Sequence, residues 1–556
     1  MAKKLISLAL SRLLVCGAVL FPAPARAVIG STVYLDGTPV CNVAANRYVV
    51  FSKPVNSYLT QTADGGFTRA CVTFEKTLLV EWYSPEGKLI RAKTVEIPML
   101  LFGGFHFGAK YNFAVFGQMN LGDDPEAEVI RVVRYDKDMN KLDEVSLKGM
   151  NTYSPFEAGS CRFAEAGGRL YVFTCHEMFA TSDGKHHQSN MTMIFDEAPL
   201  ALWDSFYDLG NIAWGGYVSH SFNQFIAVDG DRIYRADHGD ANPRALSVTL
   251  CWADDKLDYN RYTEAFQLAG NKGVNSTGAT LGGIAVTKDR VLLAATIDSQ
   301  TANYTTYYDH NSTEQRNILV TSSTKLLESK QNRTIRVTNY AADAGVQVFT
   351  PHLTRVDDET ALLMWEEIPA GKTCAVVRAV LLDAEGDPKT EIYTLEARLS
   401  DCAPVLGADG CVYWYVSDED RVLQIDGAIT SVSDGTDLIL YKLNPAHIGA
   451  FTPAKHNWTL QTTITPATCE ADGEGAFQCA VCGVTKTESL PAPGHDWGAW
   501  TVKTPATEDT VTPVGIQQGS GVRVGATQRI FTQGSLQNTG VDTDVAIVGD
   551  GFFQPR

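Results

Sequence analysis

Residues 167–173 read GGRLYVF, a tight glycine turn followed by a strand-like run of alternating side chains. Short runs rich in β-branched and aromatic residues after a turn signal are typical of β-strands. Similar units recur along most of the chain, at intervals of 51 to 70 residues. The aligned runs are Arg47–Phe51, Tyr111–Val115, Arg169–Phe173, Arg232–Tyr234, Arg290–Leu293, Thr360–Leu363 and Cys411–Trp414. Their spacing predicts seven copies of one supersecondary unit.

The units also carry a second hairpin signal, which is clearest in three of them. The turns are Tyr83–Lys88, Tyr135–Asp138 and Leu382–Asp387, each between two strand-like runs. Four strands per unit follow, and no long segment of helical period interrupts residues 28–447. This pattern resembles the β-propeller, in which four-stranded blades pack radially and only short edges stay exposed. We therefore predict an all-β fold with a seven-bladed propeller at residues 28–447; six or eight blades are the alternatives.

Polar residues just before the aligned strands are candidates for a site in the channel. The resemblance implies that the innermost strands start at the channel mouth, so that such residues converge there. The candidate ligand-binding residues are His106, Arg162, His220 and His352. Together they would hold a carboxylate, a sulfate or a sugar. The alternative interpretation is that they hydrogen-bond neighbouring blades and satisfy buried backbone groups.

Sequence signals of catalysis are sparse. No nucleophile elbow, phosphate loop or zinc-protease helix pattern occurs, and we expect no enzymatic activity. His176, His186 and His187 lie near Asp183, but the surrounding Ser, Thr and Asn residues favour a solvated loop over a metal site. A polysaccharide-cleaving propeller is an alternative, because its two carboxylates would come from distant blades.

The cysteines indicate optional crosslinks only. Eleven of the twelve follow the predicted leader, an odd number for an exported protein. Cys161 and Cys175 flank the turn at 167–168 almost symmetrically, so antiparallel pairing would bring them opposite each other. Cys41 with Cys71, and Cys402 with Cys411, are weaker candidate pairs.

A small zinc-ribbon-like module is predicted at residues 448–511. Its candidate metal ligands are Cys469, Cys479, Cys482, His456 and His495. Zinc prefers such soft tetrahedral sites, so we expect zinc on the three thiolates and on either histidine. The H-x-W and P-A-T sequences repeat at an offset of 39 residues. The segment resembles tandem H-x-W, C-x-x-C-G modules of Gram-positive bacterial surface proteins, but the second copy is interrupted, since Glu508 stands where its cysteine should be.

The last segment, residues 512–556, carries a specific family pattern. It reads FTQGSLQNTG at 531–540 and DVAIVGDGFF at 544–553, after a G-x-G-V step at 519–522. These motifs resemble bacterial flagellar basal-body rod and hook proteins, particularly the distal rod type, and imply rod or hook subunits as partners. Those proteins have apolar-heptad helices at both termini, and this chain lacks them, so the tail resembles a fragment of a rod or hook protein. Because this fragment follows an interrupted module, the sequence favours a chimeric chain. The alternative is a tail that docks on a flagellum.

The N-terminus predicts export. Residues 1–27 combine a positive n-region, an apolar core at 13–21 and a small-x-small cleavage site at 25–27, the pattern of a signal peptide. That core is too short for a membrane anchor, and no second stretch approaches the roughly eighteen apolar residues that a span needs. The formal charge of −18 offers no electrostatic route to nucleic acid, which needs clustered Lys and Arg.

These patterns together predict a bacterial protein that is secreted or held at the cell surface. Its expected function is to bind a glycan, a peptide or a surface polymer at the propeller mouth, without catalysis. A structural part in the flagellar basal body, and so in motility, is the first alternative. A polysaccharide-active enzyme is the second.

Overall fold

The computed structural model describes most of the predicted propeller and a small sheet that follows it. The described residues are 30–42, 54–207, 221–253, 257, 261–300, 314–372, 375–395, 397–417, 424–425, 428–429, 438–448, 458–479 and 485–493. They form β-strands and two short 3-10 helices, η1 (Ser329–Gln331) and η2 (Pro445–His447). Within these ranges, no helix is long and apolar enough to cross a membrane. The predicted signal peptide lies outside the described residues.

Seven antiparallel sheets of four or five strands form the blades, which we number in chain order. Blades 1 to 3 contain β2 (Ser57–Gln61), β3 (Phe67–Val72), β4 (Thr77–Tyr83) and β5 (Leu89–Glu96); β6 (Leu101–Phe107), β7 (Asn112–Gly117), β8 (Glu128–Tyr135) and β9 (Lys141–Lys148); and β10 (Ser154–Pro155), β11 (Arg162–Ala166), β12 (Arg169–Ala180), β13 (His186–Glu197) and β14 (Leu200–Phe206).

Blades 4 to 7 follow the same plan. They contain β15 (Ser221–Asp229), β16 (Arg232–Asp240), β17 (Arg244–Trp252) and β18 (Arg261–Gln267); β19 (Ala279–Val286), β20 (Arg290–Ile297), β21 (Asn317–Thr324) and β22 (Arg333–Arg336); β23 (Gln347–Val348), β24 (His352–Asp357), β25 (Thr360–Ile368), β26 (Val376–Asp383) and β27 (Tyr393–Leu395); and β28 (Val405–Leu406), β29 (Val412–Ser417), β32 (Leu438–Leu443) and β1 (Gly30–Tyr34). A two-stranded ribbon of β30 (Gln424–Ile425) and β31 (Ala428–Ile429) lies between β29 and β32 in the sequence.

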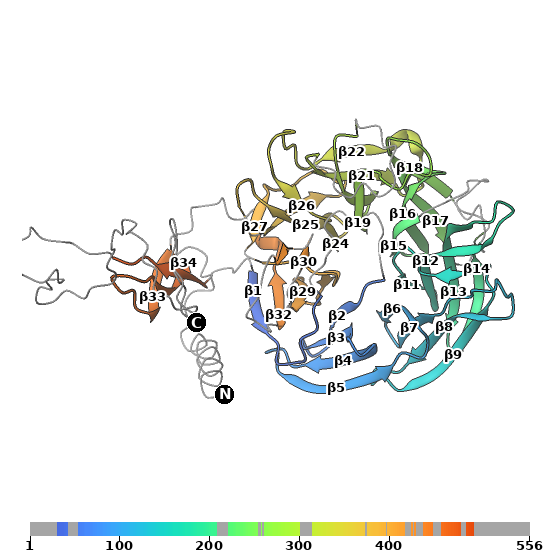
Figure 1. Cartoon of the computed structure of the whole chain (residues 1–556), viewed down its shortest axis with the longest axis horizontal. Helices are drawn as coiled ribbons and strands as arrows, with labels where there is room; N and C mark the ends of the chain where they lie inside the picture. The colour runs from blue at the N-terminus through green and yellow to red at the C-terminus, as the bar shows by residue number, and fades with distance from the viewer. Residues whose placement is uncertain are drawn as a thin grey trace, which may run out of the picture. The chain divides into compact units, whose positions relative to one another are not determined.

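The seven sheets stand in a ring with their first strands toward the centre (Figure 1). The predicted all-β fold and seven-bladed propeller are therefore confirmed. Contacts between first strands run from blade to blade, for example β11 with β15, β15 with β19 and β19 with β24. At the last of these pairs a Cβ on Gly282 would lie 2.0 Å from the carbonyl oxygen of Pro351, so only glycine allows the two backbones to approach this closely.

The central strands of each blade are buried on both faces, because neighbouring blades cover them. All six residues of β7 are buried, whereas the outermost strand β9 is largely exposed or half-buried. Strands covered on both faces have near-continuous apolar sequences. This is why the aligned runs are visible in the sequence: six of the seven fall in the second strand of a blade, at β7, β12, β16, β20, β25 and β29.

The first aligned run does not coincide with the second strand of blade 1 in the part of the chain that the structure describes. Arg47–Phe51 lies outside the described residues, and the second strand of blade 1 is β3, which reads FTRACV. Arg69 interrupts its apolar pattern, and that charge is buried only because Glu81 pairs with it across the sheet. The three predicted hairpin turns, in contrast, do join third to fourth strands, at β4–β5, β8–β9 and β26–β27.

The N-terminal strand closes the ring. β1 pairs with β32 from Gly30 opposite Leu443 to Tyr34 opposite Ile439, so the start of the described chain completes the last blade. The segment after β1 is then clamped to both of its neighbours. Thr38 donates its backbone N–H to Glu81 Oε1 of blade 1 at 2.9 Å and accepts a hydrogen bond from Arg69.

Asn42 forms the second clamp. Its Nδ2 donates to the hydroxyls of Ser57 (3.1 Å) and Ser400 (3.2 Å), and its Oδ1 accepts the N–H of Ser417 at 2.7 Å. These partners belong to blade 1, to the segment before β28 and to β29, so one buried side chain connects both sides of the closure.

The expected disulfides are not formed. Cys161, Cys175 and the four cysteines of the weaker pairs are free thiols in the structure. The β11–β12 ladder pairs Arg162 with Phe173, which carries Cys161 opposite Thr174 rather than Cys175. An offset of one residue turns the two side chains to opposite faces of a sheet.

A separate antiparallel sheet consists of β33 (Trp458–Thr465), β34 (Gly473–Cys479) and β35 (Thr485–Leu490). Its register places Trp458 of the H-x-W motif opposite Cys479, and Cys469 is exposed. Cys482, His456 and His495 lie outside the described residues, so the zinc site stays a prediction. Residues 494–556, which include the flagellar-like tail, are also outside them.

Removing the charge of Glu81 tests the first clamp. Both side chains of the Arg69–Glu81 pair are fully buried, so Glu81→Gln leaves an uncompensated guanidinium inside blade 1. We expect the free energy of unfolding to fall by about 3–5 kcal/mol, measured by urea denaturation. The matched control is Glu75→Gln in an exposed turn of the same blade, which should be neutral. Equal denaturation midpoints for the two variants would contradict the clamp.

Candidate ligand pocket in the propeller channel

A pocket of about 470 Å³ opens where the first strands of several blades begin. Its walls come from the starts of β11, β15, β19 and β24 and from the segments just before β2 and β28. Blades 1 and 3 to 7 therefore all contribute, as expected for the central channel of a propeller. Phe163, Phe225 and Phe349 supply aromatic surface, and Asn42, Arg162 and Asp401 supply polar groups.

Arg162 presents an unpaired cation to this pocket. Its Nε donates to the carbonyl oxygen of Gln224 at 3.3 Å, and its guanidinium lies over the Phe225 ring, 4.6 Å from the centroid. It makes no ion pair with a carboxylate of the described residues, and its terminal nitrogens have no protein partner among them. Burial lowers the pKa of Arg162 below its ordinary value, but an arginine stays protonated at neutral pH.

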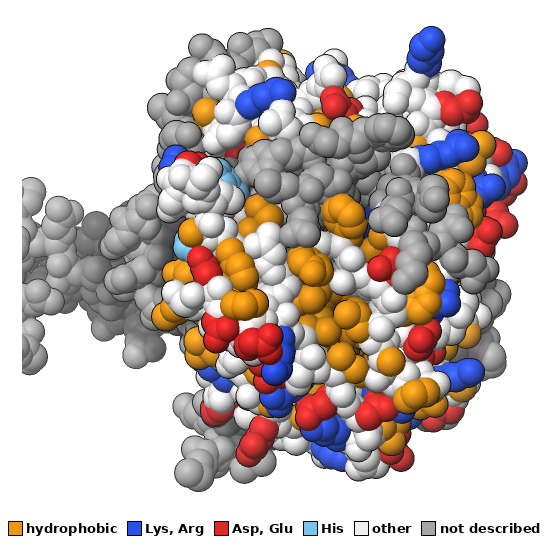
Figure 2. Space-filling model, turned by 90° about the vertical axis from the view of Figure 1, so that its right-hand side faces the viewer, with side chains coloured by type: hydrophobic (Ala, Val, Ile, Leu, Met, Phe, Trp, Pro, Cys, Tyr) orange, Lys and Arg blue, Asp and Glu red, His pale blue; other side chains and the backbone are white. Residues whose placement is uncertain are grey.

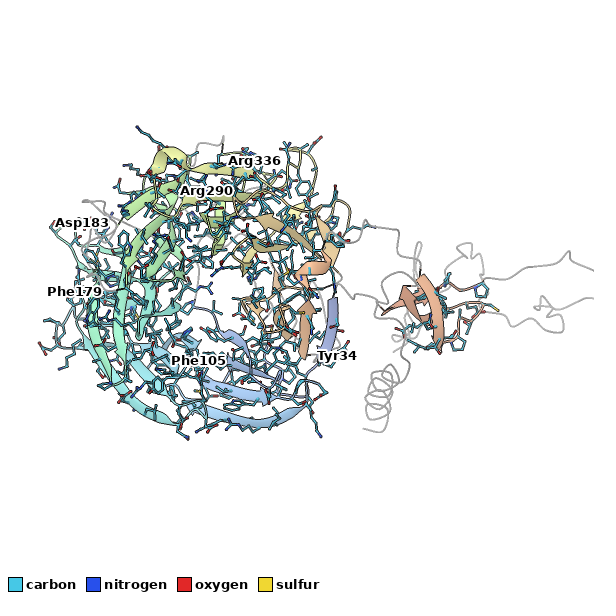
Figure 3. The ribbon with its side chains drawn as sticks, turned by 180° about the vertical axis from the view of Figure 1, so that it is seen from behind. Tyr34, Phe105, Phe179, Asp183, Arg290 and Arg336 are labelled. Carbon is cyan, nitrogen blue, oxygen red and sulfur yellow. The ribbon has the colours of Figure 1, made fainter. Side chains whose placement is uncertain are left out.

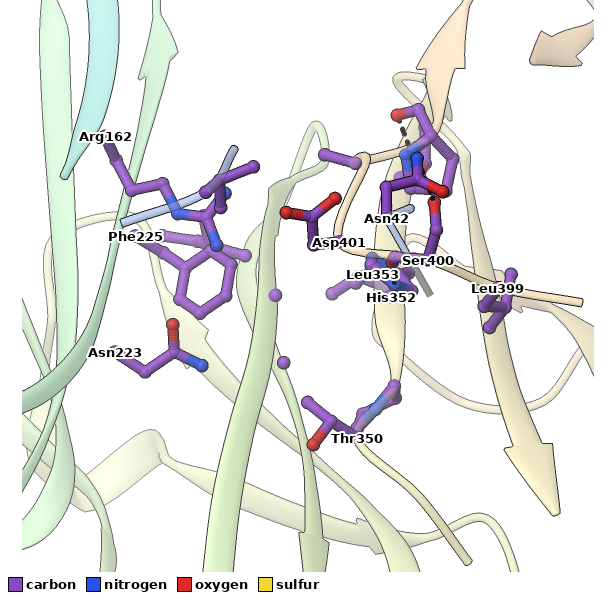
Figure 4. A pocket seen from close by; sticks show the side chains of 18 of the residues that line it. Asn42, Arg162, Asn223, Phe225, Thr350, His352, Leu353, Leu399, Ser400 and Asp401 are labelled. Atoms are coloured by element: carbon purple, nitrogen blue, oxygen red, sulfur yellow. Dashed lines mark hydrogen bonds between the residues drawn. The ribbon is translucent and has the colours of Figure 1, made fainter. Parts of the chain in front are cut away.

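Asp401 faces Arg162 from the opposite wall (Figure 4). Its Oδ2 accepts the backbone N–H of Asn56 at 3.0 Å, and its Oδ1 accepts the hydroxyl of Ser57. Burial raises the pKa of Asp401 to about 6, although these hydrogen bonds and the charge of Arg162 act in the opposite direction. At pH 7 the pocket therefore holds the positive charge of Arg162 and the negative charge of Asp401, and the two groups form no ion pair.

His352 lies beside Asp401 and is neutral. Its pKa is lowered to about 4, first by burial and then by the charge of Arg162. Its Nε2 is 3.1 Å from the carbonyl oxygen of Ser400. Because a carbonyl only accepts, Nε2 carries the proton and Nδ1 is left as an acceptor. The imidazole thus adds an acceptor to the wall that holds Asp401.

The strand register explains which predicted residues come together. Arg162 lies opposite Phe173, four residues into β12, and His352 lies opposite Met364, four residues into β25. The two side chains therefore occupy matching positions in blades 3 and 6, and both line the pocket.

His106 was predicted for the same site but does not line it. It lies opposite Phe113, one residue into β7, at the other end of its strand. There it stacks on Phe163 at 5.7 Å and its Nε2 is 3.9 Å from Glu165 Oε1. Burial lowers the pKa of His106 to about 4. The remaining predicted residue, His220, is outside the described ranges.

The polar loop around Asp183 is partly as predicted. His187 contacts Asp183 at 2.9 Å on the β12–β13 hairpin, and Figure 3 places Asp183 at the periphery of the ring. His176, however, is buried in β12, where its Nδ1 contacts the hydroxyl of Thr152 (2.7 Å) and its Nε2 contacts the carbonyl oxygen of Tyr207 (2.8 Å).

The sequence analysis missed Asp401, Asn42 and Phe225. Asp401 precedes β28 just as the selected residues precede or begin other first strands, but β28 has only two residues and gives no strand signal. Asn42 follows β1, which belongs to the last blade, so chain order concealed its position. Phe225 resembles any core residue of a strand.

The curated proteins that resemble this chain in sequence are flagellar rod and hook proteins, and the similarity lies at its C-terminal end. No family model matches. The flagellar basal-body rod protein FlgG of Borreliella burgdorferi is 59% identical over 51 residues, or 9% of this chain and 19% of that protein. FlgG of Buchnera aphidicola from Acyrthosiphon pisum is 54% identical over 46 residues, 8% of this chain and 18% of the relative. The hook protein FlgE of Helicobacter pylori strain 26695 is 66% identical over 35 residues, 6% of this chain and 5% of the relative. The chain thus spans less than a fifth of the length of these relatives.

Solved structures of similar shape are distant. A neuraminidase-like protein of subtype N10 from a little yellow-shouldered bat influenza virus has a TM-score of 0.35 at 8% identity, covering 63% of this chain and all of that one. A prolyl endopeptidase has a TM-score of 0.38 at 10% identity, covering 78% of this chain and 54% of the other. Scores this low carry no argument about function, and the fold rests on the strand pairing itself.

Because the pKa of Asp401 is raised in the folded protein, we expect the stability of the fold to depend on pH. A carboxyl whose pKa is raised in the folded state stabilises the fold while it is protonated, and this stabilisation is lost as the pH rises through the folded-state pKa. We expect the wild type to lose stability relative to Asp401→Asn between about pH 4 and pH 7. The loss should be at most about 3 kcal/mol, since one pKa unit corresponds to about 1.4 kcal/mol and channel solvent screens part of it.

Urea denaturation at pH 4.5, 6 and 8 measures this difference. Asp343→Asn, at an exposed aspartate, is the control and should change stability equally at all three pH values. Parallel curves for wild type and Asp401→Asn would show that the pKa of Asp401 is not raised.

Proposed function

We propose that the chain is a non-catalytic binding protein whose propeller channel holds part of a glycan, a peptide or a cell-surface polymer outside the cell. The observation that supports this most is the convergence of Arg162, Asp401 and His352 on one pocket. Ligand sites are commonly concave, with largely apolar walls and a few fixed polar groups, and have volumes of about 300–1,000 Å³. The channel pocket has such a volume and several fixed polar groups, and its walls combine polar with apolar surface.

The face of the molecule seen in Figure 2 offers less to a charged ligand. On the face seen in Figure 2, acidic and basic side chains are interspersed around apolar ones, without a continuous field of one sign. Surface charges that alternate in this way give little directional attraction to a charged partner. The channel, where Arg162 and Asp401 are held apart, is therefore the preferred location.

A polysaccharide hydrolase is the catalytic alternative, and the pocket contains one feature relevant to it. Hydrolysis of a glycosidic bond usually requires two carboxyl groups, and Glu366 lines the pocket in addition to Asp401. Glu366 Oε1 accepts the backbone N–H of Leu399 at 2.7 Å, which is a structural task. Any panel of candidate ligands should thus be examined for released products as well as for retention.

Channel substitutions test the binding proposal. An array of glycans, peptides and cell-wall polymers is probed with the full chain and with the double variant Arg162→Gln/Asp401→Asn. We expect the wild type to retain at least one ligand class, and the double variant to bind it about tenfold or more weakly, because two charged partners are lost. Arg91→Gln, at an exposed arginine of β5, is the control and should bind as the wild type does.

Two results would count against the proposal. Equal retention by wild type and double variant would place the ligand elsewhere. Release of shortened products by the wild type, abolished by Asp401→Asn, would favour the hydrolase.

Attachment to the flagellum is a second candidate function, which the rod and hook matches in the tail favour. We propose that residues 512–556 dock on rod or hook subunits in the basal body and hold the propeller there. The relatives that share this segment are named as flagellar basal-body rod and hook proteins, so the segment is a reasonable contact for such docking. The identity of 59% over 51 residues supports this proposal.

Deletion of residues 512–556 separates the two functions. If the tail docks, co-sedimentation of the chain with purified flagellar basal bodies should fall at least about tenfold on deletion, while ligand retention on the array stays unchanged. The control variant is Arg162→Gln/Asp401→Asn, which should co-sediment fully. Unchanged co-sedimentation without the tail would refute docking and favour a chimeric chain.

A further inference from the structure

We infer that the channel pocket is built for a sugar residue that carries a carboxylate, with the acid on Arg162 and the hydroxyls on the wall of Asp401 and His352. This inference rests on the proposed binding function and names the chemical class of its ligand.

The guanidinium of Arg162 is oriented for a planar anion. Its Nε is already occupied by the carbonyl oxygen of Gln224, and the Phe225 ring fixes its plane from one side. Its two terminal nitrogens remain, and Figure 4 shows this end of the side chain directed across the pocket. Two parallel N–H groups at the end of a guanidinium match the two oxygens of a carboxylate in a bidentate pair.

The opposite wall supplies acceptors. The Asp401 carboxyl is fixed by Asn56 and Ser57, which occupy two of about four lone-pair positions of a carboxylate. His352 keeps Nδ1 as an acceptor because Nε2 donates to Ser400. Hydroxyl groups are donors that suit both of these partners. A ligand with a carboxylate at one end and hydroxyls at the other therefore complements the two walls.

The apolar surface of the pocket fits the body of such a ligand. Phe163, Phe225 and Phe349 all line it, alongside aliphatic residues of β19 and β24. The C–H face of a pyranose ring is apolar and packs on aromatic rings, while its equatorial hydroxyls point sideways to polar partners. An amino acid or peptide end also offers a carboxylate, and its ammonium would pair with Asp401 where that carboxyl is ionised, but it lacks a ring face to pack on the three phenylalanines.

The two ligand classes differ in their pH dependence. A ligand carboxylate is repelled by ionised Asp401, so the affinity for an acidic sugar should rise as the pH falls from 7.5 toward 5.5; the affinity for a zwitterion should fall. Four neighbours of Asp401 have pKa values outside this range: burial raises the pKa of Cys71 to about 11 and the pKa values of Tyr58 and Cys402 further, while the pKa of His352 is about 4. The other carboxyl that lines the pocket, Glu366, accepts the backbone N–H of Leu399. Arg162 remains charged throughout.

Calorimetry of the full chain tests the assignment. The probes are D-glucuronate, D-galacturonate and tetragalacturonate, with D-glucose and D-galactose as matched neutral sugars and glycylglycine as the zwitterion. We expect the uronates to bind, the neutral sugars to bind at least about tenfold more weakly, and uronate binding to strengthen at pH 5.5. Arg162→Gln should reduce the affinity for uronates by about ten- to a hundredfold, because it removes a charge-assisted bidentate pair.

Two further variants keep the result interpretable. Arg162→Lys retains the positive charge but not the two parallel N–H groups of the guanidinium, so it should lose part of the affinity for uronates. It also tests the site if circular dichroism shows that Arg162→Gln folds poorly. Arg91→Gln should bind like the wild type.

The possible contrary results lead to different conclusions. Equal binding of uronates and neutral sugars, or uronate binding that survives Arg162→Gln, overturns the acidic-sugar assignment while channel binding stands. Preferential binding of glycylglycine that weakens at pH 5.5 overturns it in favour of a peptide. If the array shows a ligand that no channel variant affects, the inference and the proposed function both fail.

Discussion

Closure of the ring is the constraint on which the rest of the propeller depends. Each blade buries its central strands against two neighbours, so a ring with a gap would expose the faces of two blades at once. The chain avoids this by pairing β1 with β32, which makes the last blade from both ends of the propeller. Hydrogen bonds from Thr38 and Asn42 then fasten the segment after β1 to blades 1 and 7.

The closure and the pocket share atoms. The Ser57 hydroxyl accepts a hydrogen bond from Asn42 and donates one to Asp401, and the Ser400 hydroxyl accepts from the same Asn42 amide. The carbonyl of Ser400 in turn fixes the tautomer of His352. One wall of the pocket is therefore oriented by the network that seals the ring, whereas Arg162 is positioned independently by blade 3. The separation of the two charges follows from the ring itself, because Arg162 stands on blade 3 and Asp401 stands just before the first strand of blade 7.

Much of the fold could be predicted from the sequence because its repeats are physical repeats. Most second strands open with a short apolar run because neighbouring blades cover both of their faces, and six of the seven strands were visible for that reason. Polar residues also follow inside such strands, as in β16, where Arg235 and Asp237 are buried. The exception, β3, contains Arg69, whose burial depends on Glu81 in the next strand, twelve residues later, and this pairing is not visible in a short stretch of sequence. The site was less predictable. Arg162 and His352 each lie opposite the fifth residue of the second strand of their blade. His106 also precedes an aligned run in the sequence, but it lies opposite the second residue of β7 and so at the other end of its own strand.

The shared last blade also sets the order in which the molecule can be completed. About 400 residues separate Tyr34 from Leu438, the start of its partner strand. A ribosome adds about 5–20 residues per second, so β1 exists for tens of seconds before anything in its own chain can pair with it. During that time it is an open strand edge, which is a template for the wrong partner. A second nascent chain presents its own copy of β32 as the same pairing edge, so exchange of β1 between neighbouring chains competes with closure of a solitary ring.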